Sequence, residues 1–69
     1  MKIFGERLKE LRIEKGISQA ALAKQVGVSS GIVCLWEIDK SEPTAPNVRK
    51  VADFFDVSAD YLLGRTDTY

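Results

Sequence analysis

The segment from residue 19 to residue 37, QAALAKQVGVSSGIVCLWE, constrains the fold of this 69-residue chain more than any other feature. A small residue, Ala23, lies at its fifth place, and Gly27 lies at its ninth. Two helices joined by a short turn pack closely only where a small side chain lies at the crossing, and the turn needs a residue that accepts positive φ. The inward places are held by apolar Leu22, Val26, Val28, Val33 and Trp36. The segment therefore predicts two short helices that cross at a steep angle.

This arrangement is the one found in a helix-turn-helix, which presents its second helix to the major groove of DNA. An ordinary helical hairpin in a small bundle is the alternative interpretation. A chance match to all seven places is rare in so short a chain. The spacing therefore favours DNA binding.

Length and composition allow one domain and exclude several classes of protein. The chain is 45% apolar and 29% charged, which is typical of a globular rather than a disordered protein. No apolar run approaches the roughly 20 residues that span a bilayer, and no signal peptide opens the chain. We therefore expect a soluble, cytoplasmic protein without membrane contact.

The composition lacks histidine and has too few cysteines for a disulfide framework or a zinc site. Cys34 is the single cysteine and there is no histidine, which excludes a disulfide framework and leaves no zinc site. Without His, metal ligands or a phosphate-cradling glycine loop, we expect no enzyme activity. We also expect no metal, no cofactor and no small-molecule ligand.

Net charge is the one compositional feature that argues against a nucleic-acid partner. Ten basic and ten acidic side chains cancel, whereas DNA-binding domains are often clearly basic. Residues 1–16 hold five basic and three acidic side chains, whereas residues 37–69 hold four basic and seven acidic ones. Because phosphate attraction is local at physiological salt, one face can be positive while the chain is neutral. Zero net charge therefore predicts modest nonspecific affinity rather than no DNA binding.

Hydrophobic periodicity and capping residues predict five helices in one unit. The first helix runs over about 3–15 and ends at Gly16, the second follows a Ser18 cap, and the third runs from a Ser29 cap to about Glu37. The fourth follows a Thr44 cap, and its inward residues are Val48, Val51, Ala52 and Phe55. The last follows a Ser58 cap and ends at Gly64. We therefore expect an all-α domain over residues 1–64. Residues 65–69 lack a pattern and are expected to form a short C-terminal tail that frays.

A frame of landmarks extends over nearly the whole chain. It consists of GERLKELR at 5–12, GISQ at 16–19, LA at 22–23, GVS at 27–29, WE at 36–37, PT at 43–44, VA at 51–52 and VSADYLLG at 57–64. This frame resembles the phage-repressor and Cro type of helix-turn-helix proteins, also called the xenobiotic-response-element family. The resemblance implies a compact five-helix bundle whose second and third helices form the motif. It also implies a small transcriptional regulator, a repressor, that binds double-stranded operator DNA as a homodimer on a palindromic site.

The resemblance gives several residues structural rather than chemical roles. Arg12 is expected to pair with Glu37 and so tie the first helix to the end of the recognition helix. Loss of one partner of such a buried pair leaves the other charge buried and unpaired. Trp36 falls on the inward stripe and is expected to anchor the core rather than stack on a base.

Three residues are expected to contact the DNA backbone. Gln19 begins the second helix, where free N–H groups and the positive helix end favour an anion, and its counterparts in the family reach a phosphate. Lys40 and Ser41 follow the third helix and form a second candidate phosphate pair. The alternative for Gln19 is that it is merely a polar residue in the first turn of the helix. The alternative for Lys40 and Ser41 is that they lie in a solvated loop without a DNA contact. Asp39 stands where the family usually has Gly, and its charge weakens this second contact, although Asp tolerates positive φ.

The outward residues at the start of the third helix are the candidates for reading bases. They are Ser29, Ser30, Gly31, Cys34 and Leu35. Related domains often carry Arg, Gln, Asn or Lys at some of these places, which make bidentate bonds to guanine or adenine. Here Ser30 discriminates poorly, Gly31 permits close approach but reads nothing, and Leu35 could contact a thymine methyl. Few of these side chains can therefore select a base by direct hydrogen bonding.

Three interpretations of this face remain open. In the first, sequence specificity comes from apolar contact and DNA shape. In the second, the apolar surface of Ile32, Cys34 and Leu35 instead docks a polypeptide, as in an antitoxin-like or co-regulatory module with weak or no DNA binding. In the third, Leu35 is half-buried and contacts neither DNA nor a protein partner. Cys34 is a redox candidate or, more simply, a small semi-buried residue.

A homodimer would have to use the last helix and the tail. The candidates for this contact are Tyr61, Leu62 and Tyr69.

Overall fold

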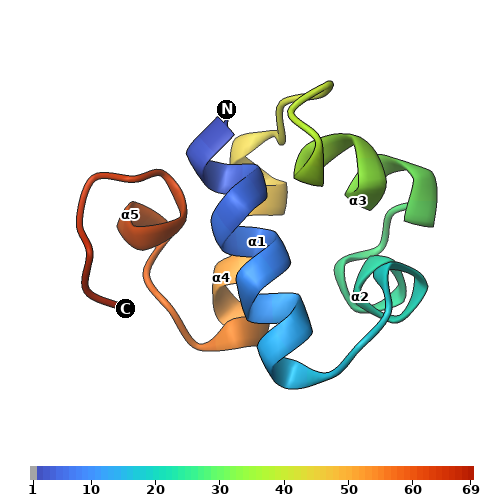
Figure 1. The fold of residues 1–69 in the computed structure, drawn as a ribbon, viewed down its shortest axis with the longest axis horizontal. Coiled ribbons are helices and arrows are strands. Elements are labelled where there is room, and N and C mark those ends of the chain that lie inside the picture. Colours follow the sequence, from blue (N-terminus) through green and yellow to red (C-terminus); the bar gives the residue numbers. More distant parts are fainter. Residues whose placement is uncertain (1) are drawn as a thin grey trace.

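The computed structural model describes residues 2–69 as five helices joined by short connections (Figure 1). The helices are α1 (Lys2–Lys15), α2 (Gln19–Val26), α3 (Ser30–Glu37), α4 (Ala45–Phe55) and α5 (Ala59–Leu62). No strand occurs in the described part of the chain. The predicted all-α, five-helix architecture is therefore confirmed. Met1, which belongs to the domain predicted over 1–64, lies outside the described residues.

Each of the last four helices begins after a Ser or Thr whose hydroxyl oxygen accepts a hydrogen bond from a backbone N–H three residues on. The pairs are Ser18 with Ala21, Ser29 with Ile32, Thr44 with Asn47 and Ser58 with Tyr61. Such a cap satisfies one of the N–H groups that a helix start leaves unpaired and contributes about 1 kcal/mol. All four capping residues predicted from the sequence are confirmed.

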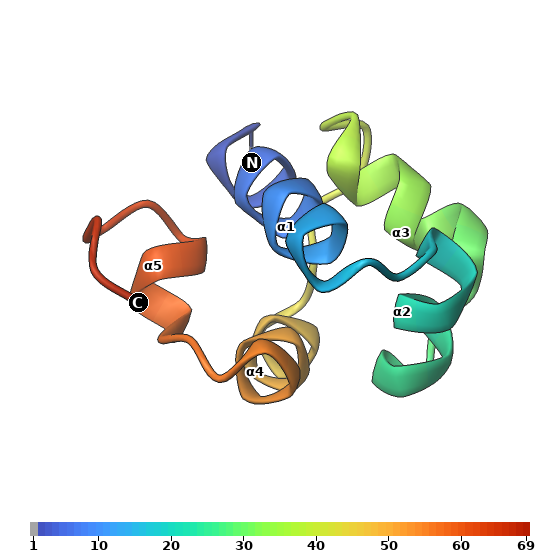
Figure 2. The same cartoon turned by 60° about the horizontal axis from the view of Figure 1, so that its bottom comes forward.

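Helix α1 lies at the centre of the molecule. In Figure 1, α2 and α3 lie on one side of it, α5 and the C-terminal segment lie on the other, and α4 passes behind. Figure 2, turned about the horizontal axis, shows α4 beneath α1, with α2 and α5 to either side. Contacts between α1 and α3, α1 and α5, α2 and α4, and α4 and α5 join these parts.

The core is apolar and contains no buried polar residue among those described. At its centre the ring of Trp36 meets the ring of Phe4 edge to face, with centroids 5.9 Å apart. The buried core consists of Phe4, Leu8, Leu11, Leu22, Ala23, Val26, Val33, Trp36, Val48, Val51, Ala52, Tyr61 and Leu62. Trp36 is thus the expected core anchor, whereas Phe55 packs against the edge of the core and is only half-buried.

The C-terminal segment 65–69 does not fray as expected but folds back along α5 and α1. The backbone N–H of Ser58 donates to the carbonyl oxygen of Tyr69 at 2.6 Å. The rings of Tyr61 and Tyr69 meet edge to face with centroids 4.8 Å apart. The Arg7 guanidinium on α1 donates to the carbonyl oxygen of Thr66 at 2.6 Å. Packing that no local sequence pattern encodes therefore orders this segment.

Among residues 2–69, no helix combines the length and the apolar character needed to cross a membrane.

Candidate nucleic-acid interface

The connection between α2 and α3 depends on the backbone conformation of Gly27. This residue has φ 83° and ψ 31°, in the left-handed region. Its N–H donates to the carbonyl oxygen of Ala23 at 2.8 Å, and the N–H of Val28 donates to the same oxygen at 3.0 Å. A Cβ at Gly27 would meet nothing within 4 Å, so its backbone angles, not lack of space, favour glycine. The predicted positive-φ turn is confirmed.

The small residue predicted at the helix crossing is buried. Ala23 lies in the core beside Leu22 and Val26, and α2 packs against α3. On α3, Val33 and Trp36 face the same core. The inward stripe predicted for the two-helix segment therefore forms, with Val28 half-buried at its edge.

The opposite face of α3 is open to solvent. Ser30 and Gly31 are exposed, Cys34 is half-buried, and Leu35 keeps 38% of its surface exposed. Ser29 is also exposed, and its hydroxyl oxygen accepts the cap bond from Ile32. All five candidate base-reading residues thus lie on or at the edge of one accessible face.

The end of α3 is tied to α1 by a nearly buried ion pair. Arg12 Nε lies 2.7 Å from Glu37 Oε2 and Arg12 Nη2 lies 3.1 Å from Glu37 Oε1, so the contact is bidentate. The Glu37 side chain is only 2% exposed. The hydrogen bonds that Arg12 donates to Glu37 raise the pKa of the Arg12 guanidinium, burial opposes the rise, and the carboxylate charge adds to it. The pair expected from the family resemblance is present.

Gln19 joins this ion pair and is not left pointing into solvent. Its amide Nε2 donates to Glu37 Oε1 at 3.0 Å, so one carboxylate accepts from both Arg12 and Gln19. Arg12 Nη1 also donates to the carbonyl oxygen of Ile17, just before α2, at 3.0 Å. The cluster of Arg12, Gln19 and Glu37 therefore connects α1, the start of α2 and the end of α3. An amide nitrogen carries two hydrogens, so one N–H of Gln19 remains for an outside acceptor.

The second residue of the connector after α3 has a left-handed backbone conformation. Asp39 has φ 62°, and the N–H of Lys40 donates to the carbonyl oxygen of Leu35 at 2.9 Å, which closes the end of α3. Asp is among the residues that tolerate this conformation when glycine is absent. Lys40 is exposed and Ser41 is half-buried, both beside the end of α3.

Gly5 is a residue near this site to which the sequence interpretation gave no role. A Cβ there would overlap the carbonyl oxygen of Trp36 and lie 3.0 Å from that of Glu37. Helix α1 therefore approaches the last turn of α3 at a point where only glycine fits. A glycine inside a helical pattern costs about 1 kcal/mol against alanine and often marks such a contact, so a signal was present.

Two of the three residues expected to form a dimer contact are unavailable for it. Tyr61 is 8% exposed and Leu62 is 0% exposed, because both complete the core of the single chain. Burial raises the pKa of the Tyr61 phenol, the neighbouring Tyr69 adds to the rise, and Arg7 opposes it. Of the three, only Tyr69 lies at the surface, with 58% of its area exposed.

The packed helix pair α2–α3, with its buried stripe, its positive-φ turn and its open outer face, defines a helix-turn-helix domain. The chain belongs to the helix-turn-helix domain family, whose model matches residues 5–68. It is 39% identical over 64 residues to the SPbeta prophage-derived HTH-type transcriptional regulator YonR of Bacillus subtilis (strain 168), over 93% of this chain. It is also 39% identical over 62 residues to Repressor protein C2 of Salmonella phage P22, over 90% of this chain. The chain spans 59% and 29% of the lengths of these two relatives.

Solved structures agree with this assignment. The P22 c2 repressor in complex with a synthetic operator matches with a TM-score of 0.84 and 37% identity, over 90% of this chain and 94% of that one. The N-terminal DNA binding domain of SinR from Bacillus subtilis matches with a TM-score of 0.84 and 33% identity, over 91% and 93% of the two chains. The resemblance to phage-repressor proteins inferred from the sequence is thus confirmed.

Proposed function

We propose that this chain binds double-stranded DNA with sequence preference, inserts α3 into the major groove, and regulates transcription, most simply as a repressor. The observation that carries the proposal is the open outer face of α3 on a fold that matches an operator-bound repressor along 94% of that chain. An α-helix fits the major groove, and the second helix of this motif is the one that enters it. Such a regulator would act in the cytoplasm.

The side chains on the outward face of α3 would select bases only weakly through direct hydrogen bonds. Ser30 has a hydroxyl that bonds to several base edges, Gly31 has no side chain, and Leu35 is apolar and partly exposed. None of them makes the bidentate bonds by which Arg, Asn or Gln select a base. Sequence preference would therefore rest on apolar contact and on the shape and deformability of the site.

Contacts to phosphates would position the domain. The remaining N–H of the Gln19 amide, held by Glu37 at the start of α2, is one donor. Lys40 and Ser41, beside the end of α3, form the other group. Because these contacts neutralise phosphates, we expect affinity for DNA to weaken steeply as salt rises, with a slope of about −0.9 for each phosphate neutralised.

A homodimer on a palindromic operator completes the proposal. Successive faces of the major groove are about 34 Å apart, one turn of the double helix. One copy of the domain measures 27 Å along its longest axis, so two copies can occupy neighbouring half-sites without overlap. Since Tyr61 and Leu62 are buried, the exposed residues Leu63 and Tyr69 are the apolar groups that α5 and the following segment offer to a partner copy.

Fluorescence anisotropy tests the proposal directly. The chain is titrated onto DNA from upstream of its own gene and onto a randomised pool, at two salt concentrations, with unrelated DNA as competitor. Binding that resists the competitor supports the proposal. A folded sample that binds neither the upstream fragment nor any member of the pool contradicts it.

Two variants separate phosphate contact from base contact. Gln19→Ala should weaken binding to all sequences to a similar extent, whereas Ser30→Ala should change the preferred base at one or two positions. Unchanged affinity in the first variant would remove Gln19 from the interface. An identical selected site in the second would show that Ser30 does not read bases.

A second candidate function is that of a protein-interaction module with weak or no DNA binding, antitoxin-like or co-regulatory. Leu35 and Ile38, at the end of α3, expose 38% and 56% of their surfaces and form an apolar area there. The structure of the SinR protein/SinI protein complex also matches this chain, with a TM-score of 0.80 and 34% identity. A complex with a co-purified polypeptide that persists at high salt, together with no DNA binding, would favour this function.

A further inference from the structure

The C-terminal segment lies on a surface formed by Arg7, Ser58 and Tyr61, termed the receiving surface. Arg7 Nη1 donates to the carbonyl oxygen of Thr66 at 2.6 Å. The backbone N–H of Ser58 donates to the carbonyl oxygen of Tyr69 at 2.6 Å, and the Tyr61 ring meets the Tyr69 ring edge to face with centroids 4.8 Å apart. Carbonyl groups and aromatic rings occur in many peptides, so these contacts do not require this chain's own segment.

The receiving surface is well packed, whereas the segment on it is held loosely. The side chain of Arg7 is 14% exposed and Tyr61 is 8% exposed. Within the segment only Thr66 is half-buried; the Asp67 side chain is fully exposed and Tyr69 is 58% exposed. Segments with few buried contacts open at a small cost in free energy. The C-terminal segment can therefore leave while the receiving surface stays formed.

The segment also leaves space unfilled beside Tyr69. A hollow of about 200 Å³ lies there, lined by Leu11, Glu14, Lys15, Phe55, Val57 and Tyr69. Several of these walls are apolar, so a group larger than the phenol of Tyr69 would bury more apolar surface in the hollow. The chain's own segment is therefore not the tightest occupant that the receiving surface accommodates.

We propose that the receiving surface is a peptide-binding site, which the C-terminal segment occupies in the free chain and from which a segment of a partner protein displaces it. The partner's segment carries a large aromatic ring three residues after the carbonyl group that Arg7 holds, as Tyr69 follows Thr66. The positive charge of Arg7 favours an acidic residue next to that carbonyl, at the place of Asp67.

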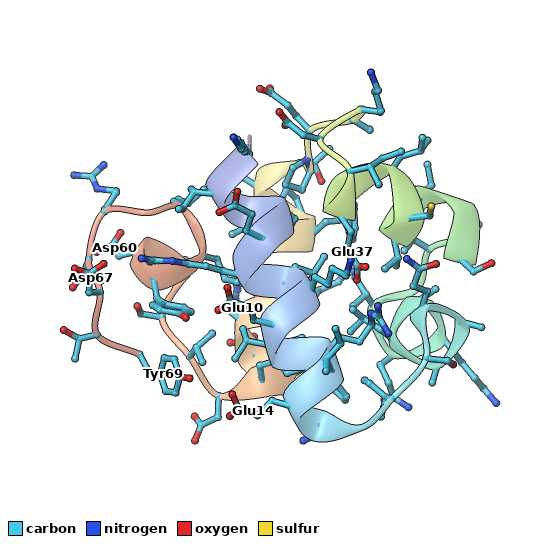
Figure 3. All side chains as sticks on the ribbon, viewed as in Figure 1. Glu10, Glu14, Glu37, Asp60, Asp67 and Tyr69 are labelled. Atoms are coloured by element: carbon cyan, nitrogen blue, oxygen red, sulfur yellow. The ribbon has the colours of Figure 1, made fainter. Side chains whose placement is uncertain are left out.

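The receiving surface lies away from the proposed DNA-reading face. In Figure 1, α5 and α3 are on opposite sides of α1, and Figure 3 shows Asp67 and Tyr69 on the side away from Glu37 at the end of α3. A partner bound there leaves the outer face of α3 open. Binding at this surface needs no DNA, so it goes beyond the proposed function and does not rest on it.

The test is a titration of the 69-residue chain with synthetic peptides, followed by amide chemical shifts. The acceptor is the variant Tyr69→Ala, whose own segment lacks the competing ring. The probe is the peptide RTDTW, which repeats residues 65–68 and ends in tryptophan. We expect saturable shifts at Ser58 and Tyr61. The unmodified chain should bind this peptide about fivefold more weakly, because an attached segment competes at a local concentration in the millimolar range.

Two controls isolate the ring and the arginine. The peptide RTDTA lacks the ring and should produce no saturable shift. The double variant Arg7→Ala, Tyr69→Ala should bind RTDTW about tenfold more weakly than Tyr69→Ala does, because hydrogen bonds from a charged donor are lost. Its shifts in α3 should stay as they are in the Tyr69→Ala variant, which shows that the fold persists.

Three results would overturn the proposal. The first is no saturable shift at Ser58 with RTDTW, and the second is equal binding of RTDTW and RTDTA. The third is equal affinity of the unmodified chain and the Tyr69→Ala variant, since the segment would then not compete. Shifts at Ser58 and Tyr61 that follow the protein concentration without peptide would identify a second copy of the chain as the occupant and overturn the choice of partner. Loss of DNA binding would contradict only the proposed function.

Discussion

Two arginines on α1 are buried to the same extent but hold different kinds of partner. The side chains of Arg7 and Arg12 are each 14% exposed. Arg12 contacts the Glu37 carboxylate, which is 2% exposed, whereas the carboxylate that Arg7 contacts, on Asp67, is fully exposed. Figure 3 shows Glu37 on the side of α1 that faces α3 and Asp67 on the opposite side, along the C-terminal segment.

The other partners of Arg7 are backbone groups and a ring. Its Nη1 donates to the carbonyl oxygens of Tyr61 and Thr66, and its guanidinium carbon lies 4.2 Å from the centre of the Tyr61 ring. A contact to a backbone carbonyl points to no particular partner in a sequence, because every residue has a carbonyl. The Arg12–Glu37 pair was expected from the family resemblance, whereas the resemblance gave no role to Arg7.

The two clusters also serve different parts of the molecule. The cluster of Arg12, Gln19 and Glu37 holds the start of α2 and the end of α3 against α1, and so sets the geometry of the proposed DNA-reading face. The Arg7 contacts hold the C-terminal segment and α5 on the far side of α1. The first cluster should therefore govern stability and DNA binding together, and the second should govern order in the C-terminal segment.

Arg12→Ala should give the largest effect. It leaves the Glu37 carboxylate buried without its cation, which costs about 3–5 kcal/mol for a buried pair that loses one partner. A domain of this size has a total stability of only about 3–10 kcal/mol, so a large unfolded fraction is expected at 25 °C. Urea unfolding followed by the fluorescence of the single tryptophan, Trp36, measures it. A loss below 1 kcal/mol would show that the pair is not needed.

Gly5→Ala should give the next largest effect and act only on the Arg12 side of α1. The new Cβ overlaps the carbonyl oxygen of Trp36, so α1 must move away from α3, and overpacking of this kind costs about 2–3 kcal/mol. Chemical shifts in α3 should change, while the contact between the rings of Tyr61 and Tyr69 should remain. Equal changes on both sides of α1 would contradict the division into two clusters.

Arg7→Ala should have a smaller effect on stability, about 1–2 kcal/mol, because the freed carbonyl groups are only partly buried and can turn to water. Its clearer consequence is release of the C-terminal segment. The amide of Ser58, which donates to Tyr69, should exchange its hydrogen faster, and the edge-to-face contact of Tyr61 and Tyr69 should weaken in the nuclear Overhauser spectrum. DNA affinity should not change. An equally protected Ser58 amide would show that Arg7 does not hold the segment.

Asp67→Asn should have the smallest effect and separates the charge of Arg7 from its backbone contacts. The Asp67 carboxylate is fully exposed, and exposed ion pairs are screened by water and salt. We expect no measurable change in melting temperature or in exchange of the Ser58 amide. If Asp67→Asn released the C-terminal segment as fully as Arg7→Ala does, the ion pair with Asp67 would be the contact that keeps the segment in place.

Much of the fold was predictable because its signals are local. The caps at Ser18, Ser29, Thr44 and Ser58 and the turn at Gly27 each depend on a few neighbouring residues. The candidate base-reading face was predictable as well, because helical spacing separates it from the buried stripe. The roles of its individual residues stay predictions, since a free surface does not show what it binds.

The sequence by itself determined the helix starts, the left-handed turn at Gly27 and the family to which the chain belongs, because short-range backbone chemistry and motif spacing encode them. Only the tertiary structure decided that Gly5 is a contact point, that Gln19 turns to Glu37, and that Tyr61 and Leu62 complete the core. It also decided that residues 65–69 are ordered. These features join positions far apart in the chain through packing and backbone carbonyls, and neither leaves a recognisable pattern along the sequence.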